Sequence, residues 1–194
     1  MKVKIGLFGG TFDPVHLAHS ALAYQSLKQF DLKYIFWIPA AVSPFKKSSD
    51  ILASAKDRLA MIQLLCEDEP RFETSDYEIK KGGISYSVET LRHFQRLFKN
   101  GEFFWILGTD ALAGVSGWKE AETLMRDLTF LTAERGVKAA GLPKELKVET
   151  IELPELPVSS SKIKTGLALG KGWDKLDAKV AAYIRKNQLY GVKA

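Results

Sequence analysis

The sequence is poor in cysteine, in histidine and in long apolar runs. Its 194 residues include one cysteine, Cys66, and three histidines. A single cysteine can form no disulfide within the chain and no cysteine metal cluster, which fits a reducing compartment. The first apolar run, residues 3–8, stops at two glycines and is too short for a signal peptide or a membrane span. We therefore expect a cytoplasmic protein that does not act at a membrane.

Low-complexity tracts, internal repeats and linkers are also missing. Hydrophobic residues make up 46% of the chain and charged residues 26%, a balance that can fill one sizeable core. We expect a single domain that covers residues 1–194. The formal net charge is +5, but residues 159–194 alone carry +6. A basic segment of this kind suits an anion such as a polyphosphate, a nucleic acid or a membrane surface, although a solvated helix face is the simplest explanation.

Apolar runs alternate with segments of helical periodicity along the chain. Strands are expected at residues 3–8, 34–38, 103–107, 128–133 and 148–153, and a further extended segment at residues 72–79. Helices are expected at residues 17–30, 54–66, 88–98, 162–168 and 174–186. The alternation predicts an α/β fold in which helices flank a mainly parallel sheet, with a small helical part at the C-terminal end. Ligands should bind beyond the carboxyl ends of the strands, in the loops after residues 8, 38 and 107.

The loop after the first expected strand carries a glycine pair and a histidine pair. It reads Gly9-Gly10-Thr11-Phe12-Asp13-Pro14-Val15-His16-Leu17-Ala18-His19. Glycine lets the backbone approach a ligand closely, and the start of a helix offers free N–H groups to an anion. His16 and His19 are three positions apart and share one face of the first helical turn. One such histidine would most simply have a capping or core role, but the pair beside a glycine loop favours a phosphate site.

Two motifs at opposite ends of the chain resemble the nucleotidyltransferase superfamily. The P-loop motif and the G-x-G-x-x-G fingerprint are both absent, which excludes an ordinary dehydrogenase. Residues 10–19 resemble the superfamily's H-x-G-H signature, with Ala18 in place of glycine. Residues 158–164 resemble its I-S-S-T-x-x-R motif, with Lys164 in place of arginine. Alone, the second motif would most simply be a serine cap on a helix, but the two motifs together indicate ATP binding.

Four further segments resemble bacterial nicotinate-nucleotide adenylyltransferases. The loop at residues 39–46 is similar to that family's loop after the second strand, with Phe45 where a histidine is usual. Residues 85–91 resemble the motif S-Y-T-x-D-T-L. Residues 108–112, followed by Trp118, resemble G-x-D-x-L…W, and the Y-I…L-Y pattern occurs near the end of the chain. The resemblance covers nearly the whole chain in the same order.

This resemblance implies a Rossmann-like nucleotidyltransferase fold and a defined reaction. The adenylyl group of ATP, the co-substrate, would pass to nicotinate mononucleotide in NAD biosynthesis. Mg²⁺ would be held mainly by phosphates and water, so no protein metal site is expected. The implied residues of the ATP site are the catalytic His16, His19, Lys46 and Lys164, with Gly9, Gly10, Thr11, Phe12, Ser159, Ser160 and Ser161. The implied mononucleotide site contains Tyr86, Ser87, Asp110, Trp118 and Arg135.

The nicotinate form of the acceptor is expected to be preferred over the nicotinamide form. A pocket with backbone N–H groups and the Ser87 hydroxyl, and with no carboxylate nearby, would favour a carboxylate over an amide. Within the same class, the acceptor could instead be phosphopantetheine, or the nucleotide CTP. From another class, the chain could be a non-catalytic nucleotide-binding or RNA-binding module. Its aromatic residues are not interleaved with lysines, so we expect no nucleic-acid partner, and homo-oligomerisation stays open.

Overall fold

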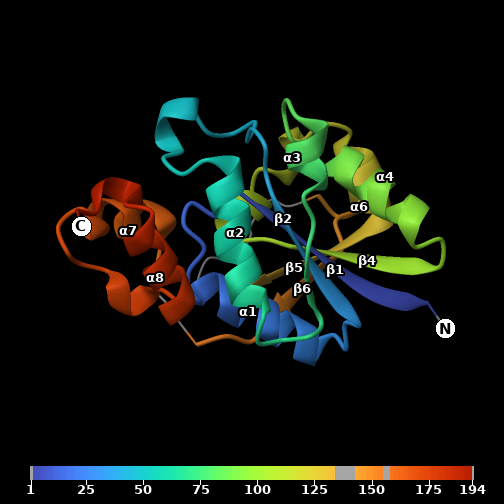
Figure 1. Cartoon of the computed structure of the whole chain (residues 1–194). Helices are drawn as coiled ribbons and strands as arrows, with labels where there is room; N and C mark the ends of the chain where they lie inside the picture. Colours follow the sequence, from blue (N-terminus) through green and yellow to red (C-terminus); the bar gives the residue numbers. More distant parts are fainter. Residues whose placement is uncertain (1, 134–142, 155–157, 194) are drawn as a thin grey trace.

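The computed structural model describes residues 2–133, 143–154 and 158–193, with a six-stranded sheet at its centre (Figure 1). The strands are β1 (Val3–Gly10), β2 (Tyr34–Pro39), β3 (Phe72–Thr74), β4 (Gly101–Ile106), β5 (Leu128–Ala133) and β6 (Val148–Ile151). The helices are α1 (Leu17–Gln29), α2 (Ala55–Cys66), α3 (Tyr77–Lys81), α4 (Ser87–Leu97), α5 (Thr109–Leu112), α6 (Ala121–Asp127), α7 (Ser160–Leu167) and α8 (Ala178–Lys186). Short 3-10 turns cover Ser48–Asp50, Val115–Gly117, Trp173–Lys175 and Leu189–Gly191. In the described part of the chain, no helix has the length and apolar content that crossing a bilayer requires.

The sheet has the order β3-β2-β1-β4-β5-β6, and every neighbouring pair is parallel. This confirms the α/β class and the parallel sheet. The chain moves outward from β1 to β3 and then crosses back to place β4 against the other side of β1, so the strand order reverses between β1 and β4. Such a reversal opens a crevice at the carboxyl ends of the strands, where ligands of these sheets bind.

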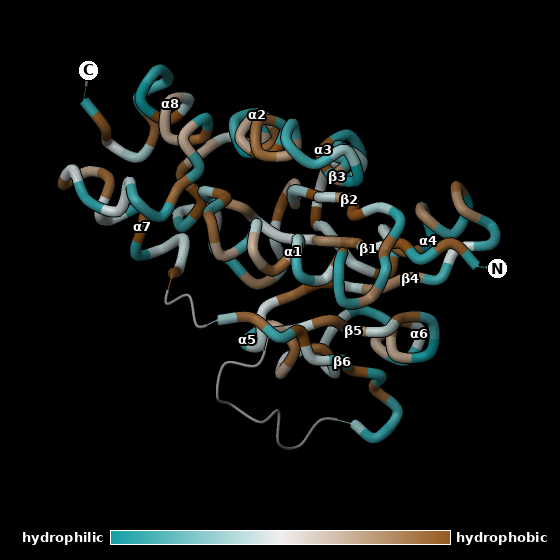
Figure 2. Tube along the Cα trace, turned by 90° about the horizontal axis from the view of Figure 1, so that it is seen from below, coloured by the Kyte–Doolittle hydropathy of each residue, from teal (hydrophilic) through white to brown (hydrophobic). Residues whose placement is uncertain are grey.

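Each central strand is buried on both faces, which explains why its residues are apolar without alternation. Phe104 and Ile106 of β4 join the core beneath α1, α2, α7 and α8, whereas Phe103 and Trp105 join the core beneath α4, α5 and α6. Figure 1 shows α1, α2, α7 and α8 on one side of the sheet and α4 and α6 on the other, and Figure 2 shows hydrophobic residues along the strands between them. The C-terminal helices therefore complete one of the two outer layers.

The extended segment predicted at residues 72–79 is only partly correct. β3 ends at Thr74, although the Ser75 N–H still donates to the Trp37 carbonyl at 2.9 Å. The five-residue helix α3 follows and places Glu78 beneath α4, where Thr90 Oγ1 donates to its carboxylate at 2.5 Å. Hydrophobic periodicity gives no sign of this hydrogen bond, so the sequence does not predict the helix that carries Glu78. The short helices α5 and α6 are also absent from the predicted elements.

The buried face of α2 also differs from the predicted one. The periodicity predicts Leu59, Met61, Ile62 and Leu65 as the apolar face, but Leu59 is only half-buried and Arg58 is 1% exposed. The Arg58 guanidinium donates from Nη1 to the Thr11 carbonyl and from Nη2 to the Ala40 carbonyl, each at 2.7 Å. These carbonyls lie just beyond β1 and β2. Arg58 therefore ties together the two loops that leave the carboxyl edge of the sheet.

Asp13 holds the C-terminal part of the chain against this edge. Its side chain is buried, and its carboxylate accepts hydrogen bonds from the Leu52 and Ala53 N–H groups at 3.0 Å, from Lys164 Nζ at 3.0 Å and from the Tyr190 hydroxyl at 2.8 Å. Burial alone would raise the pKa of Asp13, but these hydrogen bonds together hold the pKa below its ordinary value of 3.8. The loop after β2, α7 and the last 3-10 turn thus meet at one carboxylate.

Asp13→Asn is expected to lower the free energy of unfolding by about 3–5 kcal/mol, because it leaves the half-buried Lys164 without its anion and turns an amide toward N–H donors inside the protein. Asp174→Asn is the matched control, because Asp174 pairs with Lys175 at the surface, where such pairs contribute little to stability. Urea denaturation measures both variants. A loss in Asp13→Asn no larger than that of the control would contradict this role.

The same network predicts a pH dependence of stability. Since the pKa of Asp13 is lowered by folding, its contribution is present above the ordinary value of 3.8 and disappears as the pH falls through the lower folded value. Urea midpoints measured between about pH 3 and pH 6 should therefore fall on acidification by less in Asp13→Asn than in the unmodified protein.

Candidate active site

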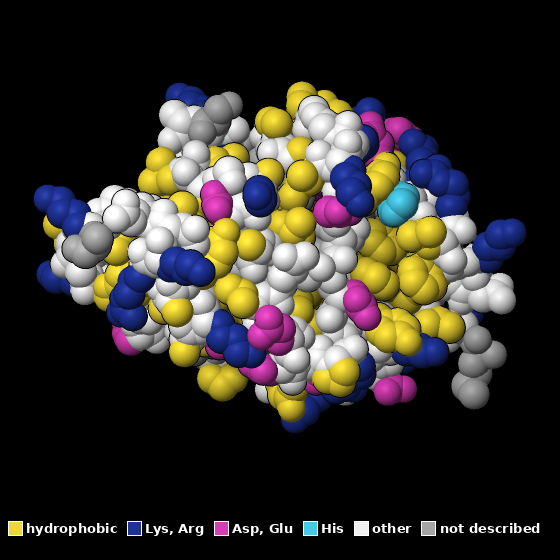
Figure 3. All heavy atoms as spheres, viewed as in Figure 1, with side chains coloured by type: hydrophobic (Ala, Val, Ile, Leu, Met, Phe, Trp, Pro, Cys, Tyr) yellow, Lys and Arg dark blue, Asp and Glu magenta, His cyan; other side chains and the backbone are white. Residues whose placement is uncertain are grey.

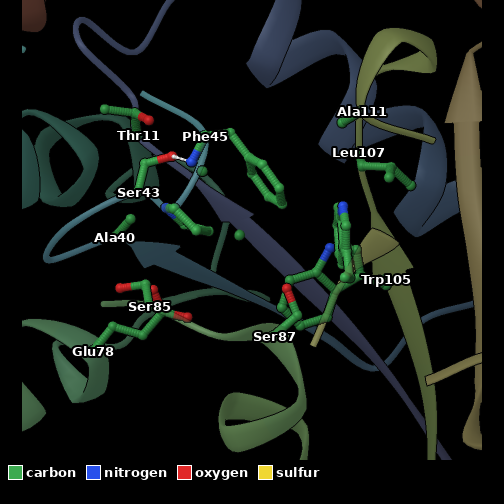
Figure 4. Close-up of a pocket in the computed structure, with 14 residues that line it drawn as sticks. Thr11, Ala40, Ser43, Phe45, Glu78, Ser85, Ser87, Trp105, Leu107 and Ala111 are labelled. Carbon is green, nitrogen blue, oxygen red and sulfur yellow. Dashed lines mark hydrogen bonds between the residues drawn. The ribbon is translucent and has the colours of Figure 1, made fainter. Parts of the chain in front are cut away.

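Two neighbouring pockets open at the carboxyl edge of the sheet, and the loop after β2 contributes to both. The switch-point pocket is lined by Gly9, Gly10, Thr11, Ala40, Ser43, Pro44, Phe45, Glu78, Ser85, Ser87, Trp105, Leu107, Ala111 and Trp118 (Figure 4). The lysine pocket is lined by Lys46, Ser49, Asp50, Leu52, Ser161, Lys164, Thr165, Ala168, Leu169, Tyr190 and Gly191. The predicted location of the site, in the loops after β1, β2 and β4, agrees with the first pocket.

Aromatic side chains form the walls of the switch-point pocket. Trp105 is 3% exposed and meets Trp118 edge-to-face, with ring centroids 6.3 Å apart. The ring of Phe45 also lies beside that of Trp118, at a centroid distance of 5.9 Å. A Cβ atom on Gly9 would lie 2.7 Å from the Trp105 ring, so this strand position has to be glycine to accept the tryptophan. The glycine of the motif is thus explained first by packing within the protein.

The floor of the switch-point pocket contains a carboxylate, contrary to expectation. Glu78 is 4% exposed, and it accepts hydrogen bonds from Thr90 and Ser85. Ser85 Oγ in turn accepts the Ala41 N–H at 3.0 Å, which connects the carboxylate to the loop after β2. Burial raises the pKa of Glu78, and the two hydroxyl donors offset only part of this effect. The expectation of a pocket without a nearby carboxylate is therefore wrong.

The lysine pocket brings two lysines together beside Asp50. Lys164 Nζ donates to Asp13 and also to the Asp50 carbonyl, while Lys46 faces the same space from the loop after β2. Burial of its ammonium end and, next, the charge of Lys164 lower the pKa of Lys46, although the Lys46 side chain as a whole is exposed. Both effects disfavour two cations in one pocket, and a bound polyanion would relieve them.

The two predicted histidines lie together at the start of α1. Their rings stack with centroids 3.7 Å apart, and His19 Nδ1 accepts the His16 N–H at 3.2 Å. His16 is the N-cap of the helix and is 4% exposed, whereas His19 is half-buried. The prediction that they share one face of the first turn is correct. They lie where the N–H groups of α1 would also attract an anion.

The second motif packs directly against the first. Ser160 Oγ donates to the Pro14 carbonyl at 3.1 Å, although the two residues are 146 positions apart in the sequence. Lys164, one turn later in α7, reaches Asp13 of the same loop. Ser159 caps α7 by accepting the Lys162 N–H at 3.3 Å. Segments almost 150 positions apart in sequence thus form one site.

The remaining predicted residues have mixed placements. Tyr86 is the N-cap of α4 and carries Lys119 Nζ 4.3 Å from its ring centroid, next to Ser87 of the switch-point pocket. The Phe12 ring is buried against Phe8 and Trp37 and lines neither pocket, so only its backbone can serve the site. Asp110 is exposed in α5 and also lines neither pocket, and Arg135 lies outside the described residues.

Sequence reasoning missed the groups that organise the site. Arg58 precedes Met61 by three positions and Ile62 by four, so helical spacing puts it on the same face as these apolar residues. That spacing alone indicates a buried charge, which needs partners within the protein. Asp13 is an acid inside an expected phosphate loop, which is unfavourable unless its charge is compensated within the protein. Glu78 had no comparable signal, because its burial depends on α4.

The arrangement offers an aromatic, partly apolar pocket beside one that contains two lysines, and the two imidazoles lie at the start of α1, although neither of them lines either pocket. Such a site can hold a planar ring in one place and a polyphosphate in the other, and it can stabilise charge that develops between them. The described cationic and aromatic side chains of the site can position anions and stabilise charge, which is the contribution that such a site makes to group transfer.

Comparisons with known proteins agree with this geometry. Residues 7–166 match the cytidylyltransferase-like family model. The chain is 34% identical over 193 residues to a protein of Listeria innocua and 37% identical over 198 residues to one of Synechococcus, each named "probable nicotinate-nucleotide adenylyltransferase". These alignments cover all of this chain and of the Listeria protein, and 96% of this chain and of the Synechococcus protein.

Solved structures show the same fold. The nicotinic acid mononucleotide adenylyltransferase of Plasmodium falciparum, complexed with APC, superposes with a TM-score of 0.81 at 21% identity, covering 100% of this chain and 99% of that one. The same enzyme complexed with NaAD gives 0.80 at 22% identity, with 98% of each chain covered. Together with the full-length sequence matches, this means that the chain belongs to the cytidylyltransferase-like family and, within it, to the nicotinate-nucleotide adenylyltransferases.

Proposed function

We propose that this protein transfers the adenylyl group of ATP to nicotinate mononucleotide, yielding nicotinate adenine dinucleotide and pyrophosphate in NAD biosynthesis. The observation that carries the proposal is the contact of the two motifs beside the two pockets, through Ser160 with Pro14 and Lys164 with Asp13. Full-length relatives of the same named activity support it. ATP is accordingly the co-substrate and the mononucleotide is the acceptor.

In the proposed reaction, an acceptor phosphate oxygen attacks the α-phosphorus of ATP in line. The bond from that phosphorus to the bridging oxygen breaks, and pyrophosphate leaves with the electron pair. Two anions have to meet, so catalysis depends on holding them in line and on stabilising the charge that moves toward pyrophosphate. We assign that role to His16 and His19, with Lys46 and Lys164 offsetting phosphate charge.

The switch-point pocket is proposed to take the acceptor and the lysine pocket the phosphates. Trp118 would stack on the pyridine ring, while Ser87 and the start of α4 would face its substituent. Ser160 and Ser161, at the start of α7, would bind phosphate together with the N–H groups of that helix. At Gly9, Gly10 and Thr11 the backbone would approach the nucleotide closely. Asp110 and Arg135 are further proposed contacts of the mononucleotide.

Mg²⁺ is proposed as a companion of the ATP phosphates. Among the described residues, no group of three or more His, Cys, Asp or Glu side chains could hold a metal ion. The carboxylate nearest the cations, that of Asp13, already accepts four hydrogen bonds. The lysines and serines suit phosphate oxygens, and Mg²⁺ in nucleotide sites is bound largely by phosphates and water. When bound, the ion would neutralise phosphate charge.

We further propose one domain over the whole chain, a cytoplasmic location, and partners limited to these small molecules. On the face shown in Figure 3, lysine and arginine side chains occur in several separate places with acidic and apolar side chains between these places, and a few of them adjoin one another at the upper right. This favours small-molecule chemistry over a nucleic-acid surface, which usually gathers its basic residues on one face. A homo-oligomer remains compatible with the proposal.

The decisive experiment incubates the protein with ATP and Mg²⁺ and one acceptor at a time, and measures pyrophosphate. Nicotinate mononucleotide should give the highest kcat/KM. Phosphopantetheine, or CTP in place of ATP, should give little product, and the reverse order would replace the proposed acceptor by one of these alternatives.

Replacing either histidine is expected to lower kcat by roughly a hundredfold or more, the scale for losing an electrostatic donor. Loss of the His19 cap should cost only about 1 kcal/mol, or a Tm decrease of roughly 2–4 °C. His93→Ala is the matched control, because His93 stacks on Tyr77 and lines neither pocket. Turnover by His16→Ala and His19→Ala equal to that of the control would remove the histidines from the mechanism.

Replacing Lys46 or Lys164 by alanine should weaken ATP binding in both cases, but only the Lys164 variant should be less stable. Lys46→Ala is expected to raise the KM for ATP about tenfold to a hundredfold, as for loss of a hydrogen bond to a charged group, with an unchanged Tm. Lys164→Ala should do the same and also lower the Tm, since Asp13 loses its cation, whereas Lys164→Arg should keep ATP binding. Lys162→Ala, an exposed neighbour on α7, serves as control. An unaltered KM for ATP in both Lys46→Ala and Lys164→Ala would show that the lysine pocket does not bind ATP.

Acceptor preference is expected to depend on the protonation of Glu78. Hydrogen bonds from the pocket to the nicotinate carboxylate, compared with an amide NH₂ that faces the same donors, are worth about 1.5–3 kcal/mol. Nicotinate mononucleotide should therefore be preferred over nicotinamide mononucleotide about tenfold to a hundredfold in kcat/KM. Below its raised pKa, Glu78 is neutral and tolerates the nicotinate anion, and above it the carboxylate repels that anion. The ratio of kcat/KM for nicotinate to that for nicotinamide mononucleotide should therefore fall as the pH rises.

The ratio cancels ionisations that the two acceptors share, so it isolates the group near their differing substituent. In Glu78→Gln, whose amide can still accept from Thr90 and Ser85, the ratio should stay constant from about pH 5 to pH 9. A pH-independent ratio in the unmodified protein, or the same pH dependence in Glu78→Gln, would show that Glu78 does not influence the acceptor.

A further inference from the structure

Phe45 is an exposed aromatic side chain whose position the proposed function leaves unexplained. It is 67% exposed, although it lines the switch-point pocket and its ring lies beside that of Trp118. Figure 4 shows the Phe45 ring projecting from the loop after β2 into the space between that loop and Trp105. An apolar ring of this size gains little free energy from burial here, so its placement points to a partner other than the protein core.

The two rings of this pair are held differently. Trp118 rests edge-to-face on Trp105, which is 3% exposed, so one wall is fixed to the sheet. Phe45 is attached only through its loop, where its N–H donates to Ser43 Oγ at 3.3 Å. At 67% exposure, its side chain has solvent around it and can change its χ1 rotamer without displacing core atoms.

The separation of the rings leaves no room for a third one as they stand. Their centroids are 5.9 Å apart and their planes are inclined by 33°. A ring between them needs about 3.5 Å on each side, or about 7 Å in all, the ordinary contact distance between carbon atoms. Phe45 must therefore swing outward by a small amount for a planar ligand to lie flat against both walls.

The positive charge of the acceptor ring would compensate for the contact that is lost when Phe45 moves away from Trp118. In nicotinate mononucleotide the ring nitrogen is bonded to the ribose, so the ring carries a positive charge. The faces of aromatic side chains are negative, and they attract cations by about 0.5–2 kcal/mol. One contact between neutral rings would then be exchanged for two contacts between a neutral ring and a cationic ring.

We propose that Phe45 and Trp118 form a two-sided aromatic clamp for the positively charged pyridinium ring of the acceptor. Trp118 is the fixed wall and Phe45 the wall that opens and closes. The identity of the clamped ring rests on the proposed function. Phe45 is thus a positioning and specificity residue for the acceptor, and it takes no part in ATP binding.

The test is calorimetric binding of nicotinate mononucleotide in the absence of ATP, followed by steady-state kinetics. Phe45→Leu keeps the apolar bulk but removes the aromatic face, so it should weaken binding about 2- to 30-fold. Phe45→Tyr should bind as the unmodified protein does. Leu97→Ala is the control, because Leu97 is also apolar and exposed but lies on α4, and this variant should bind the mononucleotide as the unmodified protein does. The KM for ATP should be the same in every variant.

Ring charge provides a second readout. Nicotinamide mononucleotide has a cationic ring, whereas its reduced form has a neutral one, and both can be measured as competitors of the acceptor. Phe45→Leu should weaken the oxidised competitor more than the reduced one. An equal loss for both would reduce Phe45 to an apolar wall and overturn the clamp.

The outcomes distinguish this proposal from the function on which it rests. Tighter acceptor binding in Phe45→Leu would identify Phe45 as a plug, and unchanged binding would identify it as a bystander; either result overturns the clamp while adenylyl transfer stands. Binding that responds to Phe45 as expected, in a protein that releases no pyrophosphate, would support the clamp and reject the reaction. A protein that does not bind the mononucleotide at all would reject both.

Discussion

The buried carboxylate of Asp13 is the interaction on which the geometry of the site depends. Removing a carboxylate from water costs several kcal/mol, and here two backbone N–H groups, a lysine and a tyrosine hydroxyl offset that cost. Since the four donors come from segments far apart in the sequence, the carboxylate can be satisfied only when the C-terminal helices are docked. Folding of the last part of the chain is thereby coupled to the shape of the first loop.

The same carboxylate also solves an electrostatic problem. An acid inside a phosphate-binding loop would repel the substrate if its charge were free. With Lys164 3.0 Å away, the pair is close to neutral as a whole, and Lys46 adds a positive charge to the same pocket. Arg58 performs the corresponding task for the backbone, because it fixes the carbonyls of Thr11 and Ala40 instead of facing the ligand. Asp13 and Arg58 thus have their partners within the protein, whereas Lys46 faces the lysine pocket.

The acceptor side follows a different principle. Trp105 and Trp118 give a rigid aromatic surface, and the packing of Trp105 requires glycine at position 9. Glu78 lies below this surface, and burial raises its pKa above the ordinary value. In the proposed function, recognition of the acceptor ring would combine stacking on Trp118 with an electrostatic contribution from Glu78.

The sequence by itself determined the elements that local rules govern. Apolar runs identified β1, β2, β4 and β5, the histidine spacing placed His16 and His19 on one helical turn, and the serines before α7 marked its start. Tertiary structure alone decided the burial of Arg58, the helix that carries Glu78 and the four partners of Asp13. Each of these places a polar group where only distant segments can supply its hydrogen bonds, and hydrophobic periodicity carries no information about such partners. It likewise decided that Phe45 faces Trp118, because a loop residue is positioned by the strands at either end of its loop and not by its own neighbours in sequence.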